Sequence, residues 1–155
     1  MDAAIKKIPY GMTNFESIIS DNYYYVDKTH YIALVEDTSR FFFFVRPRRF
    51  GKSLFLNMLG IYYDINKQDK FEEIFGGLYI GKHTTPNRNK YLVLKLNFSS
   101  VATTLEQLEQ KFNAYCKMVM RAFAKDNSHL LGEDIVEELE KYDTADEVLG
   151  FLCLS

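Results

Sequence analysis

The expected fold follows from residues 41–55, which read FFFFVRPRRFGKSLF. Residues 41–45 are apolar without alternation, as in a strand that is buried on both faces of a parallel sheet. Residues 54–62 place apolar side chains nearly all round a helix, so we expect other elements to cover that helix on most sides. A buried strand, a loop and an apolar helix in this order indicate an α/β fold with a parallel sheet.

The loop between these two elements, residues 46–53, matches the phosphate-binding pattern G-x-x-x-x-G-K-[ST] at every defined position except the first. Arg46 stands in place of the first glycine, which usually eases the turn out of the strand. Pro47 is a candidate to fix that turn instead. The open alternative is a basic surface turn that contains Gly-Lys-Ser by chance.

Each matching residue has a chemical role in such a site. Gly51 lets the backbone approach phosphate oxygens without a Cβ in the way, and the N–H groups of residues 49–53 would form an anion-binding nest at the helix N-terminus. Lys52 would neutralise the charge of the β- and γ-phosphates. The hydroxyl of Ser53, in the first turn of the helix, would bind Mg²⁺.

A second stretch, GGLYIGK at residues 76–82, satisfies G-x-x-x-x-G-K better than the loop does. Its context differs, because no strand precedes it, His83 takes the place of the hydroxyl residue and Pro86 disfavours a helix directly after it. The motif requires a strand before it and a helix after it. We therefore assign phosphate binding to residues 46–53.

Further helical signals surround the loop. Thr13, three residues before Glu16, predicts the N-cap of a short first helix. Apolar residues recur at helical spacing in residues 31–35. A helix at residues 71–75 is expected to end at the glycine pair that follows it.

The second half of the chain continues the alternation of strands and helices. Residues 91–98 predict a second buried strand, and Thr103 with Glu106 forms a capping box for a long helix. Two shorter helices are expected at about 133–141 and 144–154. The whole pattern predicts one domain with a P-loop NTPase-like, three-layer α/β fold.

Five short stretches carry a resemblance to a known family. They are IPYG at 8–11, YVDKT at 25–29, FVRPRRFGKSL at 44–54, YYD at 62–64 and LYIG at 78–81. Together they resemble the AAA-ATPase-like family that is common in gut and other anaerobic bacteria, and the resemblance covers nearly the whole chain. Arginine at the place of Arg46 is common in that family. Its full-length members resemble prokaryotic ATPases that end in a PD-(D/E)XK nuclease-like domain, which leaves nucleic acid open as a partner of the full-length protein.

The resemblance implies that residues 1–155 are the N-terminal part of one nucleotide-binding domain, with ATP and Mg²⁺ as its ligands. It also implies that residues 25–29 lie near the nucleotide, by its base, although Asp27 could instead cap the helix that follows it. The residues predicted to contact the nucleotide are Arg46, Pro47, Arg48, Arg49, Phe50, Gly51, Lys52, Ser53, Leu54 and Asp27. Ser53 is the predicted metal ligand, and no catalytic residue is assigned.

Hydrolysis requires an acidic residue at the end of a second buried strand, which holds the Mg²⁺ shell. Residues 91–98 present Asn97 at that place, and the family places its acidic pair further along, beyond Ser155. The apolar residues 151–154 indicate a truncated gene or a deliberately shortened chain, so we expect the fold to be incomplete at the C-terminus. The chain is thus predicted to bind nucleotide as the front half of an ATPase without appreciable turnover alone. The missing strand would leave a sheet edge open to self-association.

The overall charge limits the partners of the chain. The net charge is −2, so no global basic field attracts nucleic acid or an anionic membrane. Arg48 and Arg49 could still bind a nucleic-acid backbone locally, because arginine pairs with phosphate through two hydrogen bonds. An interaction or nucleic-acid-binding domain with a vestigial phosphate loop is therefore the alternative function.

The cysteines and the chain termini add few constraints. Cys116 and Cys153 lack the spacing of a zinc site or a disulfide framework. Residues 1–8 lack the apolar run of a signal peptide, and residues 41–45 are too short to span a bilayer. These features predict a cytoplasmic protein without membrane contact.

Overall fold

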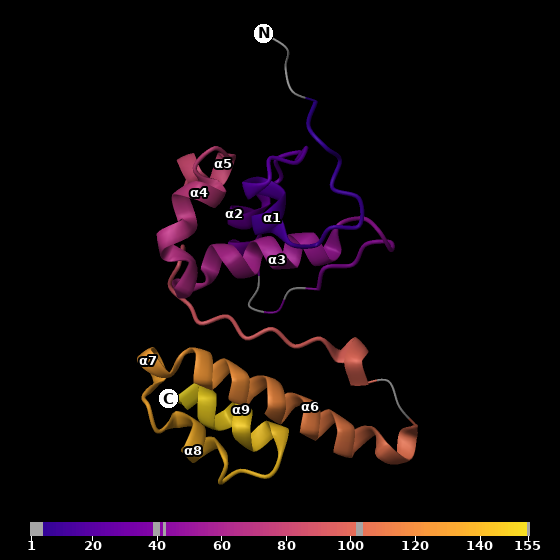
Figure 1. Cartoon of the computed structure of the whole chain (residues 1–155), viewed down its shortest axis with the longest axis vertical. Helices are drawn as coiled ribbons and strands as arrows, with labels where there is room; N and C mark the ends of the chain where they lie inside the picture. The colour runs from indigo at the N-terminus through magenta and orange to yellow at the C-terminus, as the bar shows by residue number, and fades with distance from the viewer. Residues whose placement is uncertain (1–4, 39–40, 42, 102–103, 155) are drawn as a thin grey trace. The chain divides into compact units, whose positions relative to one another are not determined.

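The computed structural model describes residues 5–38, 41, 43–101 and 104–154. They form helices and irregular loops in two compact units, unit 1 (Met1–Val93) and unit 2 (Leu94–Ser155). The helices of unit 1 are α1 (Phe15–Ser20), α2 (Tyr31–Glu36), α3 (Lys52–Tyr63), η1 (Ile65–Lys70), α4 (Phe71–Phe75) and α5 (Tyr79–Lys82) (Figure 1). The helices of unit 2 are η2 (Phe98–Val101), α6 (Leu105–Asp126), α7 (Ser128–Leu131), α8 (Ile135–Leu139) and α9 (Ala145–Leu154).

The predicted α/β fold with a parallel sheet is wrong for this structure. Within the described residues, β pairing consists of one isolated parallel bridge between Asp64 and Tyr91, and Figure 1 draws no strand among them. Residues 43–47 and 92–97 are neither helix nor strand. A strand needs a neighbour to pair its N–H and C=O groups, and neither segment has one in the described part of the chain.

The first predicted strand is also exposed where burial was expected. The exposed fractions are 86% for Phe41, 90% for Phe43 and 87% for Val45, while Phe42 lies outside the described residues. An apolar run indicates that side chains favour burial, but it does not specify the neighbouring strand on which burial in a sheet depends. Self-association through a sheet edge stays a prediction that the described residues do not test.

The core of unit 1 is built from aromatic and aliphatic side chains of α1 to α5. Phe15 of α1, Tyr62 of α3 and Phe75 of α4 are fully buried. The rings of Phe15 and Phe75 stack with their centroids 5.5 Å apart, and Tyr62 meets Phe75 edge-on at the same distance. Burial of each such side chain contributes about 1.5–3 kcal/mol. This core holds α1 and α4 against the helix that follows the phosphate loop.

The first helix begins one residue later than predicted. Its N-cap is Asn14, whose Oδ1 accepts a hydrogen bond from the backbone N–H three residues on at 3.2 Å. The predicted N-cap, Thr13, is therefore wrong, because asparagine at the next place is a stronger cap than threonine. Glu16 does not complete a capping box and pairs instead with Lys67 and Lys70 of η1, each at 2.7 Å.

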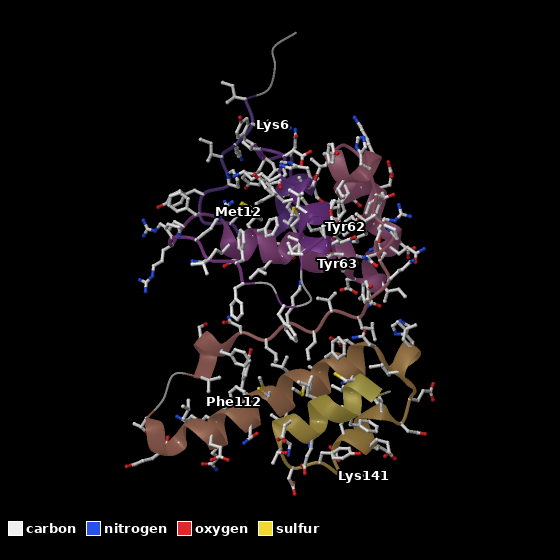
Figure 2. All side chains as sticks on the ribbon, turned by 180° about the vertical axis from the view of Figure 1, so that it is seen from behind. Lys6, Met12, Tyr62, Tyr63, Phe112 and Lys141 are labelled. Carbon is white, nitrogen blue, oxygen red and sulfur yellow. The ribbon has the colours of Figure 1, made fainter. Side chains whose placement is uncertain are left out.

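The C-terminal end of α3 is fixed by a polar network. Figure 2 labels Tyr62 and Tyr63, whose rings lie 5.3 Å apart on α3. The hydroxyl of Tyr62 accepts a hydrogen bond from Thr85 N at 2.8 Å. Thr85 Oγ1 donates in turn to Glu36 Oε1 of α2 at 2.7 Å. The network ties α2 to α3, and both helices line the cavity described below.

Unit 2 is organised around the long helix α6. α8 and α9 pack on α6, and α9 runs alongside it in Figure 1. Met120, Leu139 and Val148 form part of the buried core between these helices. The predicted long helix and the two helices after it are confirmed. Thr103 of the predicted capping box lies outside the described residues, and the N-cap of α6 is Thr104.

Over the described part of the chain, every helix is too short or too polar to cross a membrane.

Candidate functional site

The phosphate loop leads directly into α3. Residues 48 and 49 form a turn, and α3 begins at Lys52 with Gly51 as its N-cap. Gly51 has φ 75° and Arg49 has φ 67°, so both adopt the left-handed conformation. A Cβ added to Gly51 would meet no atom within 4 Å. Glycine is favoured at this position by its backbone conformation and not by a lack of space.

The side chain of Lys52 folds back over the loop. Its ammonium donates to the carbonyl oxygen of Arg46 at 2.5 Å and lies 3.5 Å from that of Pro47. Phe55 N donates to Gly51 O at 2.9 Å and so forms the first helical hydrogen bond of α3. The N–H groups before it, those of the first turn, have no partner inside the helix and point out of its N-terminus. Ser53 lies in this turn and is exposed.

The departure from the motif at Arg46 has a structural role. The guanidinium of Arg46 lies over the ring of Phe44, 5.1 Å from its centroid, and Phe44 stacks on Phe55 of α3 with centroids 4.9 Å apart. Phe44 thus links Arg46, the first residue of the loop, to α3, the helix that follows the loop. Pro47 directly precedes the turn at residues 48–49, as expected of a residue that fixes its direction.

A cavity of about 410 Å³ opens beside the loop, within unit 1. Aromatic and aliphatic side chains dominate its lining. The lining residues are Pro9, Tyr24, Tyr25, Val26, Lys28, Tyr31, Leu34, Val35, Thr38, Phe44, Arg46, Phe50, Gly51, Leu54, Phe55 and Met58. The N-terminal half of α3, predicted to be covered on most sides, therefore faces this space. Sequence reasoning missed the contribution of α2, although Tyr31 and Leu34 form a helical apolar face that is 40% and 54% exposed.

Tyr25 contributes its ring to the cavity while its hydroxyl is engaged elsewhere. The hydroxyl donates to Met58 Sδ at 3.6 Å. Burial raises the pKa of Tyr25 to about 12. The ring also meets Phe15 edge-on at 5.2 Å, so Tyr25 joins the cavity wall to the core of unit 1.

Asp27 does not line the cavity, although its neighbours Val26 and Lys28 do. Its carboxylate accepts hydrogen bonds from Thr29 N at 2.8 Å, Thr29 Oγ1 at 2.7 Å and Tyr79 N at 2.7 Å. Partial burial raises the pKa of Asp27, but these hydrogen bonds outweigh burial and hold the pKa below its usual value. Asp27 therefore stabilises the turn before α2 and the N-terminus of α5, but it is not the cap of the helix that follows it, because the N-cap of α2 is His30.

The competing glycine-lysine stretch at residues 76–82 has a different environment. Its helix, α5, has four residues. Tyr79 N donates to Asp27 Oδ2, and Ile80 N donates to Thr29 Oγ1 at 3.1 Å. Side chains of the protein thus already satisfy the N–H groups that an anion would need there.

The remaining predicted groups are at the surface of the loop or belong to unit 2. Arg48, Arg49 and Phe50 are exposed on the loop, and Phe50 also borders the cavity. Asn97 belongs to unit 2, where its Oδ1 accepts from Ser99 N at 3.2 Å and from Ser99 Oγ at 2.7 Å.

The two cysteines have different surroundings. Burial raises the pKa of the Cys116 thiol, and Cys153 is exposed. Among the described residues, no group of three or more histidine, cysteine, aspartate or glutamate side chains could hold a metal ion.

Comparison with known proteins places the chain in a family. A family model described as a predicted AAA-ATPase matches residues 9–150. The chain belongs to this AAA-ATPase-like family. This member is similar to a protein of Azotobacter chroococcum mcd 1 described as "Uncharacterized protein in vnfD 5'region", with 37% identity over 108 residues. The aligned region covers 68% of the chain and 20% of that relative, so the AAA-ATPase-like chain spans about a fifth of its length. No solved structure matches the chain.

Proposed function

We propose that this chain binds a nucleoside triphosphate, ATP in the first instance, together with Mg²⁺ through residues 46–54. The observation that carries the proposal is the N-terminus of α3. Gly51 in the left-handed conformation, the ammonium of Lys52 and the exposed Ser53 meet there beside an open cavity. Membership of a family described as predicted AAA-ATPases supports ATP as the ligand.

The phosphate chain would bind by displacing the loop's own contacts. Lys52 donates to the neutral carbonyl of Arg46, and a phosphate oxygen is a charged acceptor, which binds an ammonium more strongly. The N–H groups of the first turn of α3 supply further donors at the positive end of the helix dipole. Binding is therefore expected to move the Lys52 ammonium from the loop carbonyls onto the β- and γ-phosphates.

Mg²⁺ would arrive with the nucleotide. It binds oxygen ligands and keeps several of its waters. The exposed hydroxyl of Ser53 supplies one protein ligand, and the phosphate oxygens and waters would supply the others. This donor set fits Mg²⁺, because the ion is commonly held by few protein groups when a phosphate chain shares it.

We further propose that the chain alone turns over nucleotide poorly. Asp27 is engaged by Thr29 and Tyr79, and Asp64 accepts from Asn66 N at 3.0 Å. Neither acid is therefore poised to orient a water or to hold Mg²⁺ at the loop. Phosphoryl transfer depends on that positioning, so its loss leaves only a slow background rate.

A matched pair of lysine variants tests the binding site. Lys52→Ala removes the loop ammonium, while Lys82→Ala removes an exposed lysine from the competing stretch in α5. Mg²⁺-ATP at 100 times its dissociation constant should stabilise the wild type by about 2.7 kcal/mol. In thermal-shift titrations, Lys82→Ala should keep this stabilisation and Lys52→Ala should lose it without a change in ligand-free stability.

Three results would contradict the proposal. A Lys52→Ala protein that still binds ATP would refute the assignment of the loop. Loss of binding in Lys82→Ala alone would assign the site to the other stretch. No shift of the wild type at millimolar nucleotide would favour an interaction or nucleic-acid-binding domain with a vestigial loop.

A further inference from the structure

We propose that the cavity beside the loop holds the base of the nucleotide by stacking, and that it accepts adenine and guanine with nearly equal affinity. This inference rests on the proposed function and adds the chemistry of base selection to it. The occupant is thus a purine nucleoside triphosphate and not ATP alone.

The cavity is continuous with the proposed phosphate site. Arg46, Gly51 and Leu54 belong to the loop and also line the cavity. A ligand with phosphates at the N-terminus of α3 therefore has its other end directed to this space or to solvent. The volume of about 410 Å³ falls in the range of small-molecule sites, about 300–1,000 Å³.

The cavity offers flat apolar surfaces to a base. Tyr24 and Tyr31 line it and are 57% and 40% exposed, so their rings are accessible to a ligand. Phe44 and Phe55 contribute a stacked pair to the same lining. Stacking of a base on aromatic side chains is tolerant of sequence because every base has a π-face.

The polar side chains of the lining do not separate adenine from guanine. Among the described lining residues, none is aspartate, glutamate, asparagine or glutamine, the side chains whose fixed acceptors and donors read a base edge. The hydroxyls of Tyr24 and Tyr31 can donate or accept as the base requires, and Thr38 Oγ1, which donates to Val35 O at 2.6 Å, can still accept. Lys28 and Arg46 only donate, and both purines present N7 as an acceptor.

Strong rejection of an analogue requires a fixed polar group that the analogue leaves unpaired. The lining side chains supply rotatable hydroxyls and long cations, which can repair their hydrogen bonds with either purine. We therefore expect the affinities for ATP and GTP to agree within about 3-fold. Stacking of the base should make both nucleotides bind at least about 10-fold more tightly than inorganic tripolyphosphate.

Competition binding on the whole chain tests this inference. ATP, GTP and inorganic tripolyphosphate, each with Mg²⁺, would displace a fluorescent ATP analogue from the wild type and from Tyr31→Ala and Tyr24→Ala. Each variant should weaken the binding of ATP and of GTP equally, by about 5-fold, and leave the affinity for tripolyphosphate unchanged. Tyr10→Ala is the matched control, because Tyr10 is 91% exposed and lies outside the lining.

The outcomes separate this inference from the proposed function. If tripolyphosphate binds as tightly as ATP and depends on Lys52, the phosphate site stands and the base pocket is refuted. A preference of more than 10-fold for either purine on the wild type overturns the claim about selection, and this comparison needs no variant. If neither nucleotides nor tripolyphosphate bind, the proposed function fails and this inference fails with it.

Discussion

Asp27 offers a sharp test, because a structural cap and a nucleotide ligand predict different results for its removal. Asp27→Ala deletes the acceptor of two donors of Thr29, which is fully buried. A buried donor left unpaired costs about 1–3 kcal/mol. The N–H of Tyr79 also loses its acceptor, but Tyr79 is 47% exposed and water can replace the carboxylate there. We expect the free energy of unfolding to fall by about 2–4 kcal/mol.

Asp64→Ala is the matched control for this loss. Asp64 also accepts from a backbone N–H two residues on, at 3.0 Å, and caps η1. Its carboxylate accepts from the backbone and side chain of the neighbouring Asn66, whereas Asp27 links positions 27 and 79. An ordinary N-cap is worth about 1 kcal/mol, so Asp64→Ala should cost clearly less than Asp27→Ala.

The pH dependence of stability gives a second signature. The pKa of Asp27 is lowered in the folded state, so its stabilising contribution is complete above the unfolded pKa, near 4, and is lost as pH falls through the folded pKa. Asp27→Asn should therefore be less stable than the wild type at neutral pH, and this difference should shrink as pH falls below about 4.

Urea denaturation followed by far-UV circular dichroism measures these free energies, with two transitions fitted if the two units unfold separately. The capping argument is wrong if Asp27→Ala costs less than Asp64→Ala, or if the difference between Asp27→Asn and the wild type does not change with pH. If Asp27→Asn instead keeps full stability and loses ATP affinity, Asp27 is a nucleotide ligand, as the family resemblance implies.

Two further predictions follow from the glycines of the two competing stretches and from the position of the site within unit 1. Gly51→Ala should cost only about 1 kcal/mol of stability, because a Cβ there has open space and the strain comes from φ 75° alone. The same variant should nevertheless weaken ATP binding by at least about 10-fold. Gly81→Ala should cost about 1–3 kcal/mol of stability, because its Cβ would lie 2.0 Å from the carbonyl oxygen of Phe75. The ATP affinity of the folded Gly81→Ala protein should not change. Equal effects of the two glycine variants on ATP affinity would contradict the assignment of the loop. Leu139→Ala, which leaves a cavity at a fully buried position in unit 2, should cost about 2–5 kcal/mol and leave ATP affinity intact at temperatures where the variant is folded.

The helices could be predicted from the sequence because their signals are local. Apolar spacing and glycine punctuation located α2, α4 and the long helix α6 within a few residues. The predicted sheet was wrong because pairing is a property of two segments, and the apolar runs at residues 41–45 and 91–98 each describe only one segment without its neighbour. The cavity was missed for the same reason, since α2 and the loop contribute to it from positions that are distant in sequence.

The two glycine-lysine stretches show what spacing leaves undecided. Each stretch contains a glycine-lysine pair, at the start of α3 and at the end of α5, and the stretch that includes α5 has the better match to the motif. At α5, the carboxylate of Asp27 and the hydroxyl of Thr29 take the N–H groups of Tyr79 and Ile80. An internal anion therefore already occupies the place that an external phosphate would need. At α3, Gly51 has no side chain that could cap the helix in this way, and the first-turn donors stay available to a ligand. A glycine-lysine stretch with a helix thus predicts phosphate binding only where the chain does not supply its own carboxylate to the N–H groups of that helix. Here that carboxylate comes from a residue about fifty positions away, which no local motif can detect.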